Sequence, residues 1–380
     1  MKILQLLSDW KWTGPAEPVV SLCEALTKEG ADITIAYRKT PFDFPERTVE
    51  KQVKERGIKY HEGFKLNRYF SVKDWYFDIK AIKEFVTDKK IDVVHTNLSH
   101  DHTIAIVSLI FFNKKRPLII RTDHKREGLP QNILMRQLIQ KTDGLVTYSK
   151  KIMEKDLNYF QIPVEKTCII TPGIKIFKGP VRDLRSVWGI KPYEKVIGVV
   201  GRLKPDRGYD VILKAFKIIL SRIEHVKLVI MGRSSQIEKS IKEPLNNLGI
   251  EQDVILAGYI IDDYFSAIST FDVFVMMNAG SDGTARALRE VMSMGVPAVV
   301  SDAGMLPELV KDGIDGFVVS ADEYQLAEKI TMILKNNDLR YRFGAMARQK
   351  ALTEWDYSKQ AKRILDFYEK LLSKNKRGSL

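Results

Sequence analysis

The stretch "KVIGVVGRLKPDRGYDVILKAFKIIL", residues 195–220, contains the element pair from which the fold is built. A short apolar run ends at Gly201, a loop with Arg202, Lys204 and Arg207 follows, and apolar residues then recur at helical spacing. A short apolar run bounded by glycine predicts a buried strand, and the periodic segment predicts an amphipathic helix. The stretch therefore reads as strand, loop and helix, with three cations in the loop.

The same alternation runs through both halves of the chain. Further strands are expected at 2–8, 32–38, 91–97, 116–124, 144–149, 167–173, 226–232, 253–259, 271–277, 297–302 and 316–320, and further helices at 19–30, 72–86, 100–112, 240–249 and 262–270. Strands that alternate with helices predict mostly parallel sheets covered on both faces. The fold class is therefore α/β.

A stretch rich in proline and glycine, 171–184, separates the two series of strands and helices. A chain of 380 residues is long for one core. We predict two doubly wound domains, at 1–173 and at 174–355. The segment 358–374 forms a last amphipathic helix that must pack on another surface.

Composition sets the compartment and the class of partner. The only two cysteines, Cys23 and Cys168, make no disulfide framework and no metal cluster, so a reducing compartment is expected. The first residues are too short an apolar run for a signal peptide, and the most apolar run, 103–112, is well below the ~18 residues of a membrane span. We expect a cytoplasmic protein. The net charge of +13 favours polyanionic partners, namely phosphates, nucleic acid or anionic lipid.

In sheets of this kind ligands bind beyond the carboxyl ends of the strands. Arg202, Lys204 and Arg207 follow such an end. Arginine binds phosphate through a planar fork and lysine as a point charge, so the loop could clamp a diphosphate. An ordinary solvated basic loop is the alternative.

A second loop, 281–290, enters a helix with Asp282, Gly283 and Thr284. Glycine lets the backbone approach a ligand closely, and the free N–H groups of a helix start favour an anion. Asp282 could equally be a helix cap. Glu290 lies ~10 Å further along the helix. That distance suits a carboxylate that binds sugar hydroxyls while the helix start holds phosphate; a surface glutamate is the alternative.

The order and spacing of five blocks make the second half recognisable. They are "GRLKPDRGYDVILKAF", "VKLVIMG", "VILAGY", "FDVFVMM" and "SDGTARALREVMSMGVPAVVSDAGMLPELVKDGIDGFVV", within residues 196–320. Together they resemble the donor domain of glycosyltransferase family four, the retaining nucleotide-sugar glycosyltransferases of the GT-B fold. The resemblance implies two Rossmann-like domains facing a central cleft, with the C-terminal helix, about 356–376, crossing back onto the N-terminal acceptor domain.

The resemblance also implies roles for residues of the donor domain. Arg202 and Arg207 match the basic pair that neutralises the donor diphosphate. Asp282 matches an acid that contacts the donor sugar and is one carbon shorter than the family's glutamate, while Glu290 matches the acid that binds ribose. The substrate-binding positions are completed by Gly283 and Thr284 at the helix start, Gly201, and Arg233 and Tyr259 in the loops on the nucleobase side.

In the first half the resemblance places Gly14 in the glycine-rich first loop, followed by Glu17. His124, at a strand end, matches a histidine near the donor sugar; a structural histidine is the alternative. His95, His100 and His102 have spacings similar to a metal site, but no cysteine or tight carboxylate set accompanies them. The family binds no metal, so neither metal nor cofactor is expected.

The function implied is transfer of a sugar from a nucleotide-diphosphate sugar to a glycan or lipid-linked acceptor with retention of anomeric configuration. The family is thought to use front-face attack, so we expect no covalent nucleophile. Catalysis would rest on Asp282, His124, Arg202 and Arg207. Two alternatives stay open: a sugar-nucleotide epimerase or hydrolase on the same fold, and a basic nucleic-acid-binding protein with a degenerate nucleotide pocket. The sequence shows no nucleic-acid motif, so we expect no nucleic acid as partner.

The segment 51–77 interleaves lysine and arginine with aromatic residues. It could rest on an anionic bilayer, where polybasic surfaces gain ~1 kcal/mol per cation, which would place the protein peripherally at the inner face of the membrane. A loop followed by a core helix is the alternative.

Overall fold

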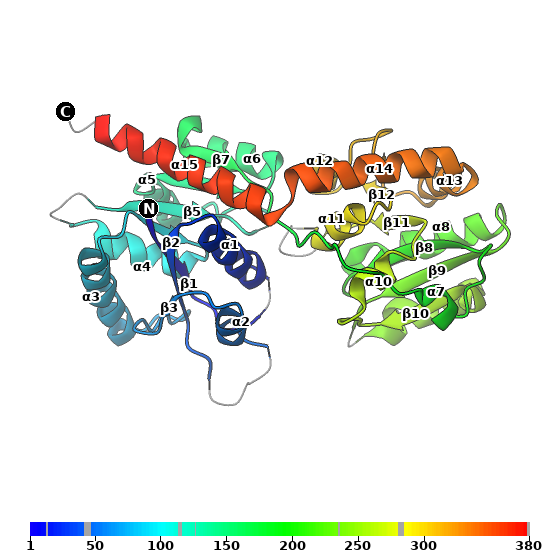
Figure 1. Ribbon diagram of the computed structural model, residues 1–380, viewed down its shortest axis with the longest axis horizontal. Helices are drawn as coiled ribbons and strands as arrows, with labels where there is room; N and C mark the ends of the chain where they lie inside the picture. The colour runs from blue at the N-terminus through cyan, green and yellow to red at the C-terminus, as the bar shows by residue number, and fades with distance from the viewer. Residues whose placement is uncertain are drawn as a thin grey trace. The chain divides into compact units, whose positions relative to one another are not determined.

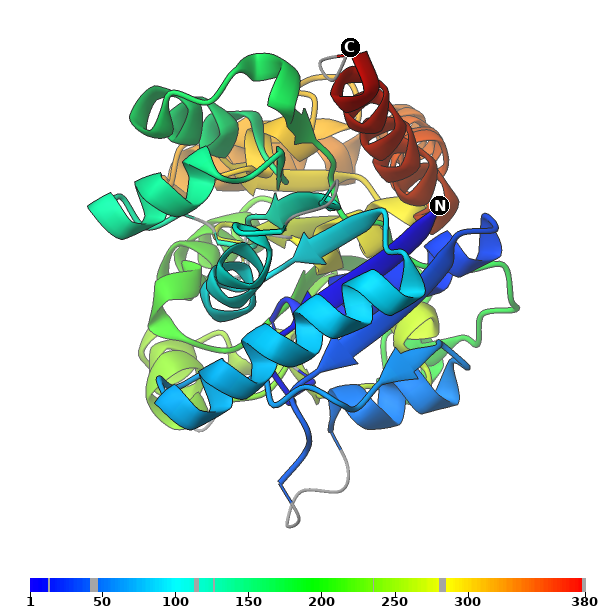
Figure 2. The same cartoon turned by 90° about the vertical axis from the view of Figure 1, so that its left-hand side faces the viewer.

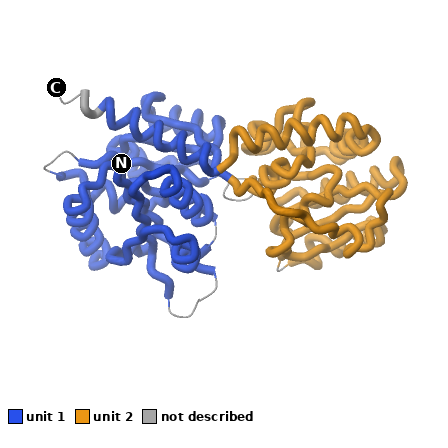
Figure 3. The backbone as a smooth tube through the Cα atoms, viewed as in Figure 1, with its two compact units in different colours: residues 1–173, 357–380 blue, residues 174–356 orange. Residues whose placement is uncertain are grey.

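The computed structural model describes residues 1–12, 14–41, 47–112, 116–125, 127–234, 236–279 and 285–377, with side chains as far as 374. The chain forms two compact units, shown in Figure 3. Unit 1 comprises Met1–Gly173 and Tyr357–Leu380, and unit 2 comprises Ile174–Asp356. The chain therefore leaves unit 1 once and returns to it for its last helix.

Unit 1 is built on a seven-stranded sheet of order β3-β2-β1-β4-β5-β6-β7, in which neighbouring strands are parallel. Its elements, labelled as in Figure 1, are β1 (Lys2–Leu7), α1 (Ala16–Lys28), β2 (Asp32–Tyr37), α2 (Val49–Glu55), β3 (Tyr60–His61), α3 (Val72–Lys89), β4 (Val93–Thr96), α4 (Ser99–Leu109), β5 (Leu118–Thr122), α5 (Ile133–Gln140), β6 (Gly144–Thr147), α6 (Lys150–Phe160), η1 (Val164–Lys166), β7 (Thr167–Ile169) and α15 (Tyr357–Arg377).

Apolar clusters cover both faces of this sheet. On one face α1 and α15 pack against β1 and β2, and α15 contributes Ala361, Ile364, Tyr368 and Leu371 at helical spacing. On the other face α3, α4 and α5 pack against the strands. Because alternate strand side chains point to opposite faces, an almost wholly apolar strand such as β1 is stable only when both faces are covered.

Unit 2 is built on a six-stranded parallel sheet of order β10-β9-β8-β11-β12-β13. Its elements are α7 (Leu184–Val187), β8 (Lys195–Val200), η2 (Pro205–Arg207), α8 (Tyr209–Leu220), β9 (Val226–Met231), η3 (Glu238–Lys242), α9 (Glu243–Leu248), η4 (Glu251–Asp253), β10 (Val254–Gly258), α10 (Tyr264–Ile268), β11 (Val273–Met276), α11 (Arg286–Ser293), β12 (Ala298–Ser301), α12 (Leu306–Leu309), β13 (Gly316–Val319), α13 (Glu323–Lys335) and α14 (Asn337–Glu354).

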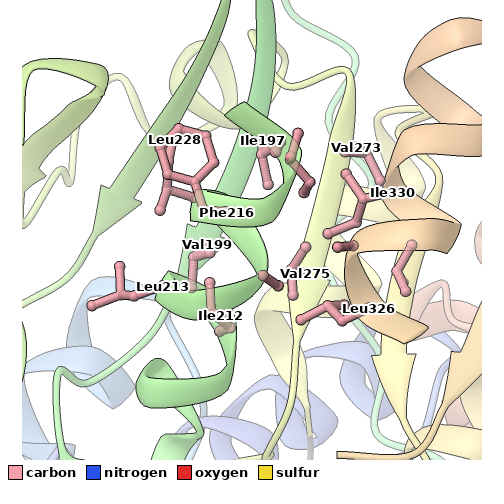
Figure 4. Close-up of a cluster of buried hydrophobic side chains, with 14 of the residues drawn as sticks. Ile197, Val199, Ile212, Leu213, Phe216, Leu228, Val273, Val275, Leu326 and Ile330 are labelled. Atoms are coloured by element: carbon pink, nitrogen blue, oxygen red, sulfur yellow. The ribbon is translucent and has the colours of Figure 1, made fainter. Parts of the chain in front are cut away.

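The core of unit 2 forms where α8 and α13 meet the sheet (Figure 4). Ile212 and Phe216 of α8 lie in one cluster with Ile197 and Val275 of β8 and β11, and Ile330 of α13 joins it. The opening stretch of the sequence is thus a strand, a loop and a helix packed on each other. The prediction of two doubly wound α/β domains is confirmed.

Helices α13 and α14 are among those that were not expected from the sequence. The buried residues of α14 are Phe343, Gly344, Ala347 and Ala351, so small side chains make up most of its inner face. An added Cβ at Gly344 would lie 2.1 Å from the carbonyl oxygen of Gly295. This helix packs by close backbone approach, and close approach leaves little apolar periodicity to detect.

The strand orders determine which loops are neighbours. In each sheet the order reverses at one point, between β1 and β4 in unit 1 and between β8 and β11 in unit 2. Ligands of open parallel sheets bind at the carboxyl ends of the strands beside such a point. Within the described ranges, no helix has the length and apolar composition needed to cross a membrane.

Candidate active site

The floor of the candidate site in unit 2 is made by the loops that leave β8, β9 and β10. The N–H of Gly201 donates to the carbonyl of Met231 at 3.0 Å, and the N–H of Gly232 donates to that of Gly258 at 2.7 Å. Gly232 has φ of +153°, and an added Cβ there would lie 1.8 Å from the carbonyl oxygen of Gly201. Only glycine allows the two loops to approach so closely.

Arg207 joins the loops that follow β8 and β11. Its Nη1 donates to the carbonyl of Ala279, and Asn278 Nδ2 donates to the carbonyl of Asp206 at 3.0 Å. Only 12% of the Arg207 side chain is exposed, whereas Arg202 and Lys204 are exposed. The predicted diphosphate clamp thus contains one arginine that is fixed by the backbone and two cations that project into solvent.

The predictions for Asp282, Gly283 and Thr284 fall in 280–284, which lies outside the described residues. The described chain stops at Ala279, the backbone partner of Arg207, and resumes at Ala285. Ala285 has φ of +44° and directly precedes α11. The two ends of this stretch therefore belong to the same edge of the sheet as the basic loop.

Glu290 lies on the second turn of α11 and is buried, with 4% of its surface exposed. Its Oε1 accepts from Arg286 Nε at 2.7 Å. Tyr264 hydrogen-bonds to the same carboxylate, and burial together with the charge of Glu290 raises the pKa of the Tyr264 hydroxyl. Glu290 is therefore not a solvated surface glutamate but a buried carboxylate held by a cation and a phenol.

Arg233 and Tyr259 lie together beyond β9 and β10. The guanidinium carbon of Arg233 is 4.8 Å from the centre of the Tyr259 ring, and over half of the tyrosine is exposed. An arginine stacked on a tyrosine presents flat polar and aromatic surfaces, which suit a planar ligand.

His124 of unit 1 is buried and hydrogen-bonded through both ring nitrogens. Nε2 donates to Oδ1 of Asn97 at 2.9 Å, and the Tyr148 hydroxyl donates to Nδ1 at 2.5 Å. Asn97 is oriented by its own Nδ2, which donates to the carbonyl of Leu6 at 2.8 Å. Burial and the positive charge of Arg121 hold the pKa of His124 well below its usual value. His124 is thus a neutral ring in a chain of hydrogen bonds that links the exits of β1, β4, β5 and β6.

Asp101, on the first turn of α4, fixes the same edge. Its carboxylate accepts from the backbone N–H groups of Ser8, Asn97 and Leu98 at 2.8–3.0 Å. Burial raises the pKa of Asp101 to about 6 in spite of these donors and of Arg121.

Gly14 and Glu17 lie at the loop and helix that follow β1. Gly14 has φ of +54°, which glycine adopts without strain. Glu17 Oε1 accepts from Ser21 Oγ at 3.0 Å and from the hydroxyl of Tyr357 at 2.8 Å. Glu17 therefore fastens α1 to the first turn of α15.

Two further histidines of the first half, His95 and His102, are structural partners of hydroxyl groups, whereas the ring of His100 packs on that of Trp75. His95 contacts the hydroxyls of Tyr368 and Thr122, both at 2.5 Å, and His102 Nε2 lies 2.8 Å from Thr142 Oγ1. Burial lowers the pKa of His95 to about 3, so its ring is neutral. In the part of the chain that the structure describes, no group of three or more His, Cys, Asp and Glu side chains could hold a metal ion.

Several partners in these networks were not anticipated from the sequence. Arg286 precedes Glu290 by four residues on α11, and this i,i+4 spacing of opposite charges is a signal that could have revealed it. Tyr264 and Tyr148 carry no such signal, because they reach Glu290 and His124 from other elements.

Two family models match the chain. The model described as "Glycosyl transferases group 1" matches residues 181–350, and the one described as "Glycosyltransferase Family 4" matches residues 13–176. Together they span both units. The chain belongs to this family of glycosyltransferases, which have the GT-B fold.

Individual relatives are distant. The phosphatidyl-myo-inositol mannosyltransferase of Mycobacterium leprae is 29% identical over 178 residues, which is 46% of each chain. A glycosyltransferase of Rickettsia africae ESF-5 has a structure similar to this one with a TM-score of 0.81 and 16% identity, covering 98% of both chains. HepE of Anabaena in complex with UDP has a TM-score of 0.78 and 17% identity, covering 96% of this chain and 99% of its own. The alignments cover about half the length of the first curated relatives, namely 52%, 59% and 46%.

Proposed function

We propose that the protein is a glycosyltransferase that moves a sugar from a nucleotide-diphosphate sugar to a glycan or lipid-linked acceptor. The observation that carries this proposal is the meeting of the β8 and β11 loops. Arg207 donates a hydrogen bond to Ala279, which directly precedes the segment that contains Asp282. Helix α11 follows this segment and contains the buried carboxylate of Glu290. A diphosphate beside Arg207 and a ribose at Glu290 would occupy this edge together.

Charge accounts for the proposed chemistry. Loss of the nucleoside diphosphate builds negative charge on phosphate, which Arg202, Arg207 and the N-terminal end of α11, together with Gly283 and Thr284, would stabilise. These cations would perform the role of a metal ion, so we expect a metal-independent enzyme. Asp282 would position the donor sugar.

Retention is proposed without a covalent nucleophile. The leaving phosphate oxygen would accept the proton of the acceptor hydroxyl on the face from which it departs. In the described structure both nitrogens of His124 are bound to protein groups. A contact of His124 with a substrate would therefore use its ring edge or require a rearrangement of Tyr148.

The nucleoside would bind between Glu290 and the pair Arg233 and Tyr259, with Gly201 beneath the phosphates. Arg286 covers Glu290 but is itself 45% exposed. Its long side chain can turn into solvent and release the carboxylate for the ribose hydroxyls.

The test is nucleotide binding by Glu290→Gln, measured as the rise in melting temperature with UDP, GDP or ADP and their sugars. Charge-assisted hydrogen bonds contribute ~1.5–3 kcal/mol each, so we expect a roughly tenfold to hundredfold loss of affinity. Glu354→Gln, at an exposed residue of α14, is the matched control. Full affinity and full transfer in Glu290→Gln would refute the assignment.

Product analysis separates transfer from the alternatives. Transfer gives a new glycosidic bond with the anomeric configuration of the donor, in the presence of EDTA. A free sugar or an altered nucleotide sugar as the only product would establish a hydrolase or epimerase instead.

A further inference from the structure

Exposed apolar side chains gather at the beginning of α3 in unit 1. Tyr69, Phe70, Val72 and Tyr76 each have 70–73% of their surface exposed, and Phe77 has 46%. Single exposed apolar residues are normal on a protein surface, but five within nine positions form a continuous cluster. We call these five residues the aromatic patch.

The loop that presents the aromatic patch is well fixed. The buried carboxylate of Asp78 accepts from the N–H groups of Lys65 and Leu66 at 2.7 and 2.8 Å. Asn67 Nδ2 donates to Asp74 at 2.9 Å, and Ser71 caps α3. The aromatic side chains are therefore held outward by a hydrogen-bonded loop.

Positive charge surrounds the aromatic patch. The exposed cations of this segment are Lys65, Arg68, Lys73, Lys80 and Lys83. Lys65 lies 5.5 Å from the ring centre of Phe77, and the guanidinium of Arg38 lies 5.8 Å from that of Tyr69. Lys80 pairs with Glu84 at 3.9 Å, and Arg68 lies 4.0 Å from Asp9. Asp74 and Asp78 are bound to the groups named above, and Glu62 and Glu84 flank the segment. The surface thus combines exposed rings with an excess of cations.

The aromatic patch lies at the edge of unit 1 where the strands end. Because α3 runs back along the sheet between β3 and β4, its first turn lies at their carboxyl end; Figure 2 shows α3 in front of unit 1. The ring centres of Phe70 and Trp75 are 4.9 Å apart, and those of Trp75 and His100 are 5.3 Å apart. His100 is on the first turn of α4, just after Asn97, so a row of rings connects the patch to the edge that holds His124.

We infer that the aromatic patch binds the surface of an anionic lipid bilayer and that the acceptor is a lipid within that bilayer. Aromatic rings favour the headgroup level of a membrane, and cations nearby gain from anionic lipids. The membrane contact rests on the patch alone, whereas the acceptor class rests on the proposed function. A second copy of the chain fits poorly, because a symmetric contact would place the cations of one copy against those of the other.

The experiment is flotation of the full chain with vesicles of phosphatidylcholine, with or without phosphatidylglycerol. We expect binding to the anionic vesicles that falls as salt is added. The double variant Tyr69→Ser/Tyr76→Ser should reduce the vesicle-bound fraction about tenfold, because it removes two rings that would be partly buried in the bilayer interface. Lys73→Glu/Lys80→Glu should reduce it by about fivefold or more per residue. Phe111→Ser, at a residue that is 79% exposed beyond the end of α4, should have no effect.

Three results would overturn the inference: absence of vesicle binding by the wild type, equal binding by the patch variants, or a dimer of the wild type that the patch variants lose. The melting temperature with and without nucleoside diphosphate is measured for the same proteins. If vesicles are not bound but nucleotide still raises the melting temperature, only the membrane inference fails. If vesicles are bound and no nucleotide sugar has an effect, the proposed function fails and the membrane contact stands.

Discussion

Replacement of Gly232 by alanine tests the floor of the candidate site. The new Cβ would lie 1.8 Å from the carbonyl oxygen of Gly201, so the loops after β8 and β9 must separate by more than ~1 Å. The φ of +153° adds strain, because this region is essentially restricted to glycine. Strain of ~1–3 kcal/mol and overpacking of ~1–3 kcal/mol predict a loss of ~2–6 kcal/mol in the free energy of unfolding.

Gly249→Ala is the matched control for this prediction. Gly249 also has a positive φ, of +66°, but an added Cβ would meet nothing within 4 Å. It should cost only ~1 kcal/mol and leave nucleotide binding unchanged. Denaturant unfolding and nucleotide-dependent melting of both variants provide the comparison. If Gly232→Ala is as stable as Gly249→Ala and binds nucleotide like the wild type, the close approach of the two loops has no role in the site.

Three further perturbations concern the networks of unit 1. Burial and the negative charge of Asp123 raise the pKa of Asp156 to about 7. The folded state therefore holds a proton on this carboxyl that the unfolded state releases near pH 4. The free energy of unfolding of the protein should therefore fall by up to ~1.4 kcal/mol per pH unit as the pH rises from about 4 to about 7. In urea unfolding, Asp156→Asn should reduce this dependence on pH. Glu17→Ala removes the acceptor that ties α1 to α15 and should cost ~1–3 kcal/mol in the same measurement. Tyr148→Phe removes the donor to Nδ1 of His124 and should cost ~1–2 kcal/mol.

Each of these has its own control or contrary outcome. An unchanged pH slope in Asp156→Asn would show that this carboxyl titrates normally in the folded protein. Glu55→Ala, on the exposed face of α2, should be nearly neutral where Glu17→Ala is not. A Tyr148→Phe variant as stable as the wild type would mean that the short contact with His124 contributes nothing to folding.

Sequence patterns located most elements because burial leaves a local record. The helix expected at 72–86 is α3, and its inner residues Ile82 and Val86 are buried. The last amphipathic segment is α15, which packs on unit 1. By contrast, α14 went unrecognised because glycine and alanine form most of its inner face. A large apolar inner face is not sufficient by itself, since α13 buries Leu326, Ile330 and Ile333 and was not expected either.

For the candidate site, the sequence identified candidate residues but not their partners in the folded structure. Arg207 and Glu290 were singled out from charge and spacing alone. Whether Glu290 was buried or solvated depended on Arg286 and Tyr264, and the second of these lies on α10, far away in the sequence. His124 was placed at a strand end, but its hydrogen bonds to Asn97 and Tyr148 required two other strand ends to be its neighbours.

The sequence by itself determined the alternation of strands and helices and the residue types in the loops, since these follow from composition and short-range periodicity. The order of the strands was decided only by the tertiary structure, which places β8 beside β11 and so brings Arg207 to Ala279. The physical reason is that neighbours in a parallel sheet are separated along the chain by whole crossover connections. Their pairing depends on packing across the entire core, and no short stretch of sequence contains that information.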